Sequence, residues 1–474
     1  MTETKTVRPS GVRKPWIKPS LIVHRNGMVN KFGAIRQKTS SGSLFGVPVD
    51  RLVEDHGSPL FVYAEERLRE NIRHLQSVFA SRYPRVQCAW SYKTNYLGAI
   101  CNVFHQEGAW AEVVSGFEYA KARSAGVPGN EIIFNGPHKT RDALERAVNE
   151  AAHIHIDHLD ELYLLDKLAA QSGREIDVSI RLNFETGYSE NWARFGFNVE
   201  TGQAMDAAWR ISASDNLNLT GLHSHIGTFI LDHRAYAAQA RIMASFMNEV
   251  EERTGCEIEI LDVGGGFASR NALQGIYLPP EQVVPSIEQY ADAICVPILE
   301  ATHERTAMGR RLPLLILETG RAIVDDAGAL VTTVFGNKKL PDGRRAVILD
   351  AGVNLLFTAF WYNHDVRPTR ELTGAPEETV LYGPLCMNID VVRHSVLLPP
   401  MDVGDRLIVS PVGAYNNTQW LQFIEYRPNI VLVQADGEVA LIREREDLDR
   451  ITALERIPPH LELDLPAVPG DQFG

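Results

Sequence analysis

Residues 86–97 read VQCAWSYKTNYL, and the interpretation of the whole chain starts from this stretch. Its first part is rich in β-branched and aromatic residues, which predicts a strand. Lys93 follows at the carboxyl end of that strand, and Thr94 or Asn95 is suited to cap a helix that begins near Tyr96. A lysine in this position is more often a solvated charge than a nucleophile. Its role therefore depends on what the rest of the chain places beside it.

The composition is typical of a soluble globular protein. The chain has 474 residues, of which 45% are hydrophobic and 23% charged, enough for two domain cores. A formal net charge of −13 and the lack of a long apolar run give no basis for binding nucleic acid or spanning a membrane. We therefore expect a small-molecule enzyme.

The five cysteines are scattered and form no CxxC pair, so neither a disulfide framework nor a metal site is expected. This pattern indicates a cytoplasmic protein. Residues 1–20 contain lysines and arginines without a following apolar segment, which predicts a flexible arm rather than a secretory signal.

Eight strand-like runs alternate with segments of helical periodicity, beginning with a helical pattern over 65–77. Alternating strands and helices require a parallel sheet, and eight such units in about 250 residues have the dimensions of a (β/α)8 TIM barrel. An open doubly wound sheet is the alternative, and the number of strands disfavours it. The predicted strands are 86–91, 109–114, 131–135, 154–157, 177–183, 217–225, 257–263 and 314–318.

After Gly320 the pattern changes to strands joined by turns, which predicts a β-rich domain of sandwich or barrel type. Early strand-like pieces at 21–24, 45–49 and 60–63 have no partner of their own, so we expect them to complete this domain. The predicted later strands are 329–335, 346–350, 378–382, 406–409, 430–434 and 440–443. The predicted divisions are an arm (1–20), N-terminal strands (21–64), the barrel (65–323), the β domain (324–457) and an irregular tail (458–474).

Two glycine-containing turns follow the seventh and eighth predicted strands. Gly264, Gly265 and Gly266 lie in the first turn, and Gly320 and Arg321 lie in the second. Glycines let backbone N–H groups approach an anion closely, and arginine adds a planar cation suited to phosphate. The loops after strands seven and eight of such barrels commonly bind phosphate. A glycine triplet alone is also typical of a flexible turn, but the two turns together favour a phosphate site.

A phosphate site, a lysine and a carboxylate on one rim indicate pyridoxal 5'-phosphate (PLP). PLP forms an imine with a lysine, here Lys93, and withdraws electrons strongly when an acid, here Glu318, keeps its ring nitrogen protonated. The sixth predicted strand carries His223 and His225 on one side, because side chains alternate along a strand. Either histidine could lie on the ring or be structural, and Thr228 could donate to the phosphate.

Together these motifs resemble the fold-type III, alanine-racemase-like PLP enzymes, above all the diaminopimelate and ornithine decarboxylase group. The resemblance extends over about residues 45–433. It implies that Lys93 is the Schiff-base lysine, His225 the ring-stacking histidine and Glu318 the partner of the pyridine nitrogen. The phosphate ligands that it implies are Thr228, Gly264, Gly265, Gly266, Gly320 and Arg321.

The resemblance also extends into the β domain. GPLC at 383–386 and GAY at 413–415 are similar to two motifs of the family, which implies that Cys386 acts near the substrate and that Tyr415 touches the cofactor. In the family the cysteine segment completes the site of the other subunit. A homodimer with composite active sites is therefore implied.

The chain departs from the family where the substrate would bind. Cys386 is followed by Met387 and Asn388 instead of the Glu-Ser of diaminopimelate enzymes or the aspartate of ornithine enzymes. LFTAFWY at 356–362 replaces an Arg-Pro-x-Leu-Tyr motif. We therefore take Asp350, Cys386, Met387 and Asn388 as candidate substrate contacts, with Asp390 as a further acidic candidate.

These departures predict a substrate whose distal end is less charged, larger or conjugated. The sequence-based expectation is a PLP-dependent decarboxylase of a modified or pathway-specific amino acid, such as a siderophore or antibiotic intermediate. The alternatives are a diaminopimelate decarboxylase of lysine biosynthesis, an amino-acid racemase and a non-enzymatic PLP-binding protein. Glu318 favours decarboxylation over racemisation, since racemases of the family typically have an arginine there.

Overall fold

The computed structural model describes residues 29–30, 33–34 and 40–463, and the chain divides into two compact units, 1–39 and 40–474. In the first unit, β1 (Val29–Asn30) and β2 (Gly33–Ala34) form a short antiparallel pair. The predicted arm at 1–20 and strand at 21–24 lie outside the described residues. In the part of the chain that is described, no helix combines the length and the apolar character needed to cross a bilayer.

The second unit contains the predicted (β/α)8 barrel. Eight parallel strands are hydrogen-bonded in the order β6-β7-β8-β9-β10-β12-β13-β14, and β14 pairs with β6 to close the barrel. The strands are β6 (Val86–Ser91), β7 (Trp110–Val113), β8 (Ile132–Phe134), β9 (His153–Ile156), β10 (Ile176–Asn183), β12 (Leu217–Ser224), β13 (Ile260–Asp262) and β14 (Leu314–Thr319). A short strand, β11 (Phe197–Asn198), pairs beside β10. Each barrel strand overlaps a predicted one, so the predicted fold class is confirmed.

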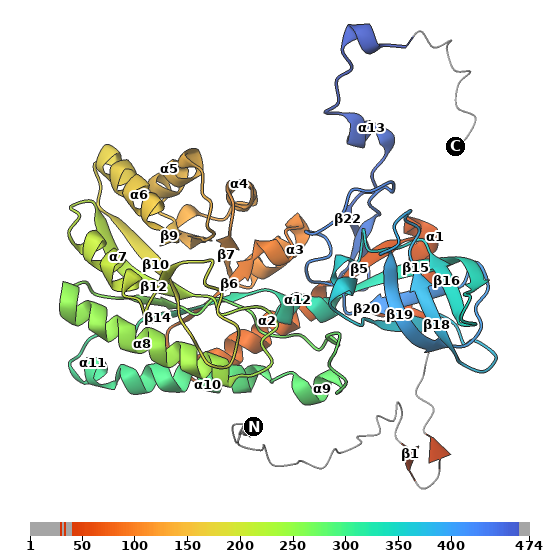
Figure 1. Ribbon diagram of the computed structural model, residues 1–474, viewed down its shortest axis with the longest axis horizontal. Coiled ribbons are helices and arrows are strands. Elements are labelled where there is room, and N and C mark those ends of the chain that lie inside the picture. Colours follow the sequence, from red (N-terminus) through yellow and green to blue (C-terminus); the bar gives the residue numbers. More distant parts are fainter. Residues whose placement is uncertain (1–28, 31–32, 35–39, 464–474) are drawn as a thin grey trace, which may run out of the picture. The chain divides into compact units, whose positions relative to one another are not determined.

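Helices cover the outside of the barrel, as Figure 1 shows. Side-chain caps start several of them: Ser115 caps α4, Thr140 caps α5, and Ser286 with Gln289 forms a capping box at α10. The helices of the barrel region are α2 (Glu65–Ala80), α3 (Gly98–Gln106), α4 (Gly116–Ser124), α5 (Arg141–Asn149), α6 (Leu159–Ser172), α7 (Gln203–Ser212), α8 (Arg234–Thr254), α9 (Pro280–Val283), α10 (Ile287–Ala301), α11 (His303–Ala307) and α12 (Arg321–Val324).

The predicted cap after Lys93 is wrong. A short 3₁₀ turn, η1 (Tyr92–Thr94), follows β6, and α3 begins only at Gly98 with no side-chain cap. Asn95 is engaged elsewhere, because its Nδ2 donates to the Tyr63 hydroxyl at 3.0 Å and to the Gly413 carbonyl at 3.2 Å. Tertiary contacts with the β domain therefore take precedence over local helix capping.

The predicted β domain is also present, and an N-terminal strand completes it. β5 (Leu60–Ala64) pairs antiparallel with β15 and parallel with β21, as the unpaired early strands predicted. The later strands are β15 (Gly328–Lys339), β16 (Arg345–Leu349), β17 (Asp365–Pro368), β18 (Glu377–Tyr382), β19 (Val391–Leu398), β20 (Arg406–Ser410), β21 (Ile430–Val433) and β22 (Val439–Arg443).

Some short elements differ from the prediction. β17 and β19 were not predicted, and β19 exposes several polar side chains, which obscures its pattern. The predicted strand at 45–49 is instead a tight hairpin, β3 (Ser43–Leu44) and β4 (Val47–Pro48), followed by α1 (Val49–His56). Near the end of the described chain, α13 (Leu448–Thr452) and a 3₁₀ turn at Pro459–Leu461 are present.

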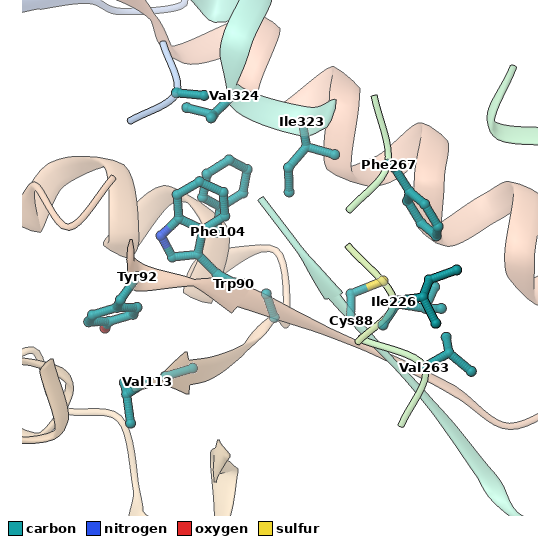
Figure 2. Close-up of a cluster of buried hydrophobic side chains, with 14 of the residues drawn as sticks. Cys88, Trp90, Tyr92, Phe104, Val113, Ile226, Val263, Phe267, Ile323 and Val324 are labelled. Atoms are coloured by element: carbon teal, nitrogen blue, oxygen red, sulfur yellow. The ribbon is translucent and has the colours of Figure 1, made fainter. Parts of the chain in front are cut away.

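The alternation of β6 decides where Lys93 points. Cys88, Trp90 and Tyr92 belong to the core between the strands and the helices, where Trp90 stacks on Phe104 with ring centroids 4.1 Å apart (Figure 2). Ala89 belongs to a separate apolar cluster with residues of other barrel strands, inside the barrel. Because side chains alternate along a strand, Lys93 shares the interior phase of Ala89.

Candidate active site

One polar residue from each barrel strand lies at the carboxyl end of the barrel interior. Seven of the eight are buried, and the Lys93 side chain is 34% exposed. This set, here called the polar ring, consists of Lys93, Glu112, Asn135, His155, Arg181, His223, Asp262 and Glu318. Polar groups cluster here because this face of a parallel barrel forms the active site in such folds.

Lys93 is held by a buried carboxylate. Its Nζ lies 3.0 Å from both Glu112 oxygens, and Ser91 Oγ donates to the same carboxylate. Desolvation lowers the pKa of Lys93, but the neighbouring carboxylates, Glu112 above all, outweigh it, so the net shift is upward. The amine is therefore charged, and it stays hydrogen-bonded to Glu112 until a ligand displaces this ion pair.

The backbone around Lys93 is fixed by the β domain. Thr418 Oγ1 donates to the Lys93 carbonyl at 2.8 Å, and the Tyr415 amide donates to the Thr94 carbonyl at 2.8 Å. Tyr415 adopts a left-handed backbone conformation, with φ of +64°, which is uncommon for a residue other than glycine. Such strain persists only where the surroundings enforce it. The two domains thus build one site.

A cavity of about 660 Å³ opens over this site, and Lys93, His225, Thr228, Glu318, Arg321 and Tyr415 all line it. Arg321 lies against the rings of Tyr415 and Tyr362, with its guanidinium carbon 4.7 Å and 4.9 Å from their centroids. Its Nε and Nη1 are buried and have no hydrogen-bond acceptor among the described residues, and Thr94 Oγ1 is likewise unpaired. Buried donors of this kind require an acceptor, which a bound phosphate group would supply.

The glycine turns leave room where side chains would not fit. A Cβ on Gly265 would lie 2.2 Å from the Glu318 carbonyl oxygen, and one on Gly266 would lie 2.3 Å from the Gly227 carbonyl oxygen. A Cβ on Gly320 would meet Thr94 Oγ1 at 2.2 Å. The chain therefore needs glycine at these positions for the turns to approach each other and an anion.

Replacing Gly265 by alanine is expected to lower phosphate-cofactor affinity at least about tenfold and to destabilise the fold by about 1–3 kcal/mol, because the added methyl group strikes backbone. Cofactor titration and thermal unfolding measure the two effects. Gly98→Ala is the matched control, since a Cβ there meets nothing within 4 Å. Unchanged affinity in the Gly265 variant would contradict this assignment.

His223 on β12 and His225 just after that strand have different surroundings. His225 accepts a hydrogen bond from the Gly265 amide at Nδ1, at 3.0 Å, and the edge of Trp192 approaches its ring. His223 stacks on His155 with centroids 4.6 Å apart. Burial lowers the pKa of all three imidazoles well below the usual value, so they are neutral.

Glu318 lies at the centre of an acidic group. Asn135 Nδ2 donates to Glu318 and also to Glu112, at 3.2 Å from the latter. Burial, followed by the charges of Asp262 and Glu112, raises the pKa of Glu318 well above its usual value. Burial is also the main cause that raises the pKa of Asp262 to about 7.

Several candidate substrate residues lie away from this cavity. Asp350 accepts hydrogen bonds from Ser58 Oγ at 2.5 Å and from Thr332 Oγ1 at 2.6 Å. Asp390 accepts from the amides of Val353 and Leu385, both at 2.8 Å. These two aspartates therefore have structural partners.

The cysteine segment is at the surface of this chain. Cys386 and Asn388 are exposed and Met387 is half-buried. None of the three is among the residues that line the cavity described above. Within one chain, the structure does not bring these residues to Lys93.

Five members of the polar ring were missed in the sequence: Glu112, Asn135, His155, Arg181 and Asp262. Each lies within or just after a short apolar strand, where an isolated polar residue in the interior phase is the available signal. Comparing the carboxyl ends of all eight predicted strands would have found them. Lys93 was conspicuous because a predicted strand ends at it, and Glu318 because it precedes the glycine turn that points to phosphate.

Comparisons with known proteins agree with this geometry. Residues 69–325 match the family model described as pyridoxal-dependent decarboxylase, pyridoxal binding domain. Diaminopimelate decarboxylase from Methanocaldococcus jannaschii is 31% identical over 435 residues, covering 88% of this chain and 95% of the relative. The enzyme of that name from Bacillus subtilis is 29% identical over 426 residues, covering 86% and 94%. A crystal structure of the M. jannaschii enzyme has a TM-score of 0.80 at 30% identity, covering 88% and 96%.

The chain belongs to the family of pyridoxal-dependent decarboxylases, the carboxy-lyase class that its barrel and polar ring resemble. Its cofactor is PLP. The residues present fit that group, because the unpaired Arg321 and Thr94 donors and the glycine turns suit a phosphate. An amino acid is accordingly the class of substrate.

One expectation from the sequence is wrong. The preference for a modified amino acid, such as a siderophore or antibiotic intermediate, rested on local departures near Met387 and at 356–362. Relatives named diaminopimelate decarboxylase align over 86–88% of this chain at 29–31% identity. Agreement over the whole chain outweighs a few altered positions, so the diaminopimelate alternative is the better supported one.

Proposed function

We propose that this chain decarboxylates diaminopimelate, releasing CO2 and leaving lysine. The observation that carries the proposal is the full-length similarity to enzymes of that name, combined with a cavity in which Lys93, Glu318 and Arg321 meet. A crystal structure of the M. jannaschii enzyme in co-complex with L-lysine has a TM-score of 0.80 at 29% identity. This supports an amino acid of that size as the product.

In the proposed mechanism Lys93 supplies the amine that holds the cofactor, and Glu112 accepts its hydrogen bonds at Nζ beforehand. PLP, when bound, withdraws electrons from the carbon that loses CO2. Glu318 and neutral His225 both line the cavity, where Glu318 would stabilise a protonated ring nitrogen and His225 would pack against the ring.

The remaining residues would anchor the phosphate of the cofactor and enclose that end of the site. Arg321, Thr228 and the amides of the two glycine turns would bind the phosphate, and Tyr415 of the β domain packs against Arg321 at that end of the site. The phosphate ligands proposed are Thr228, Gly264, Gly265, Gly266, Gly320 and Arg321. These residues would keep the cofactor in place when Lys93 is not attached to it.

The experiment is a CO2-release assay on diaminopimelate, with lysine, ornithine, arginine and glutamate as competitors. We expect kcat/KM for diaminopimelate of at least about 10⁴ M⁻¹s⁻¹, the usual lower range for a true substrate. Turnover of another amino acid at that rate, with diaminopimelate at least about 100-fold slower, would contradict the proposal. Chirality of the unreacted substrate detects racemisation in the same samples.

The site is further proposed to be shared between two subunits of a homodimer. Cys386 is exposed in this chain and lies outside the cavity, which supports a role in the partner's site. Asp350, Met387 and Asn388 remain proposed substrate contacts only through such an arrangement or through rearrangement of the β domain.

Mixing two inactive proteins tests the shared site. If Lys93→Ala and Cys386→Ala chains exchange freely, half of the dimers are mixed and each mixed dimer has one intact site. Activity should recover to about a quarter of wild type. Native mass spectrometry establishes that exchange has occurred, and no recovery after exchange would show that each site is built within one chain.

A further inference from the structure

The polar ring contains three carboxylates, on Glu112, Asp262 and Glu318, but two cations, on Lys93 and Arg181. The proposed function gives Asp262 no role. Lys93 pairs with Glu112, and Arg181 Nε lies 3.9 Å from Asp157 Oδ1. Lys139, on the loop after β8, forms an ion pair with Glu161, with 2.6 Å between Nζ and Oε1. The nearby cations are therefore matched by other carboxylates.

Among the described residues, Asp262 and Glu318 form no ion pair with Lys93 or Arg181, and the basic groups that approach their carboxylates are the neutral His155 and His223. They lie on the neighbouring strands β13 and β14, and their carboxylate oxygens are within 4.8 Å of each other and of nitrogens of His155 and His223. His223 Nδ1 is 3.4 Å from Asp262 Oδ1 and 3.7 Å from Glu318 Oε1. Two ionised carboxylates this close in a buried site repel strongly, because little solvent screens them.

The contacts of Asp262 show which oxygen is free to carry a proton. Oδ1 accepts a hydrogen bond from the Gly264 amide at 2.8 Å, whereas Oδ2 is buried and has no partner among the described residues. Both ring nitrogens of His155 and of His223 are likewise unpaired there. Asn135 already donates to Glu318. A proton on Asp262 would relieve the repulsion without disturbing any of these contacts.

We propose that Asp262 and Glu318 share one proton, so that the pair carries a single negative charge beneath the cofactor ring. Asp262 is then a positioning residue: it donates to Glu318 and sets the charge that the ring nitrogen meets. One negative charge matches one protonated ring nitrogen, whereas a dianion would be left half unpaired. The raised pKa values of both acids are consistent with a retained proton. This inference rests on the family's cofactor and not on diaminopimelate as the substrate.

Groups from all the other barrel strands surround the pair. The groups that face the pair are Lys93 after β6, Glu112 on β7, Asn135 after β8, His155 on β9, Arg181 on β10 and His223 on β12. Among them Glu112 has its own cation, Lys93, and the histidines are neutral through burial. The shared proton therefore belongs to Asp262 and Glu318.

The test is the pH dependence of the visible absorption of the PLP-loaded protein. In wild type, raising the pH removes the shared proton, and the cofactor band should shift over some part of the range from about pH 6 to 9. Asp262→Asn replaces the protonated acid by an amide that still accepts from the Gly264 amide and donates to Glu318. It should therefore keep the neutral-pH spectrum and lose the shift.

Two further variants sharpen the result. Asp262→Leu removes the donor altogether and should lower kcat at least about tenfold. Glu118→Gln is the matched control: burial also raises the pKa of Glu118 to about 7, but Glu118 does not line the cavity. The control should retain the wild-type shift.

The outcome for Asp262→Asn decides the inference even if the leucine variant does not fold. A wild-type spectral shift in the asparagine variant would overturn it, because no shared proton would then be titrating. Loss of the shift in Glu118→Gln would also overturn it, by assigning the titration to a different acid.

Discussion

Replacing Lys93 by alanine is expected to lower kcat/KM by at least about 10⁴-fold, the scale on which loss of a covalent nucleophile acts. Lys93 is the polar-ring amine, held 3.0 Å from both Glu112 oxygens and facing the cavity. The variant should still fold, since the backbone hydrogen bonds of Lys93 with Thr418 and of Thr94 with Tyr415 do not involve the Lys93 side chain. Steady-state kinetics and circular dichroism measure the two properties.

Peptide mapping identifies the residue independently of activity. Borohydride reduction of wild-type holoprotein should fix the cofactor on the peptide that contains Lys93. Lys167→Ala, an exposed lysine on α6, is the matched control and should keep full activity and labelling. A label on any other lysine would show that the amine has been misassigned.

The fold could be predicted from the sequence because its strands are short, apolar and separated by strong helical patterns. Strand β6 coincides with the predicted 86–91 and leads directly to Lys93, whose contact with Glu112 places its amine inside the barrel. The helix start after Lys93 was not accessible. It depends on Asn95 reaching Tyr63 and Gly413, which are distant in sequence.

The site was predicted in part for the same reason. Lys93, Glu318 and Arg321 lie in or beside short motifs that predict a function from the sequence alone. All three line one cavity. Glu112 and Asp262 have no such motif, and their importance arises only when strands close around the barrel axis. Substrate contacts were the least predictable, because Cys386 lies on the surface of this chain and its proposed role needs a second subunit.

The division of labour between domains follows from these contacts. The barrel supplies the polar ring, while the β domain fixes the turn that carries the Lys93 amine. Thr418 and Tyr415 hold the Lys93–Thr94 backbone from outside the barrel, and Asp325 accepts from the Gly413 and Ala414 amides to hold that segment. A family member with the barrel alone would lack these restraints, so precise positioning of Lys93 requires both domains.

Replacing Glu318 by glutamine is expected to lower kcat about 10²–10³-fold while leaving cofactor affinity largely intact. A neutral amide side chain at this position cannot stabilise a charged ring nitrogen, whereas Arg321 and the glycine turns still hold the phosphate. Kinetics and cofactor titration separate the two effects. Equal activity in the variant would contradict the role of Glu318 at the ring nitrogen.

The stability of the same variant distinguishes a catalytic loss from a damaged fold. Burial and the neighbouring acids raise the pKa of Glu318 in the folded protein, so Glu318 binds its proton more tightly there than in the unfolded chain. Its contribution to stability is complete below the unfolded pKa of about 4.3 and declines as the pH rises toward the folded value. Glu318→Gln removes this decline. The cofactor-free variant should therefore unfold at pH 8 at a temperature equal to or above that of wild type, and a lower temperature would attribute the kinetic loss to disrupted packing.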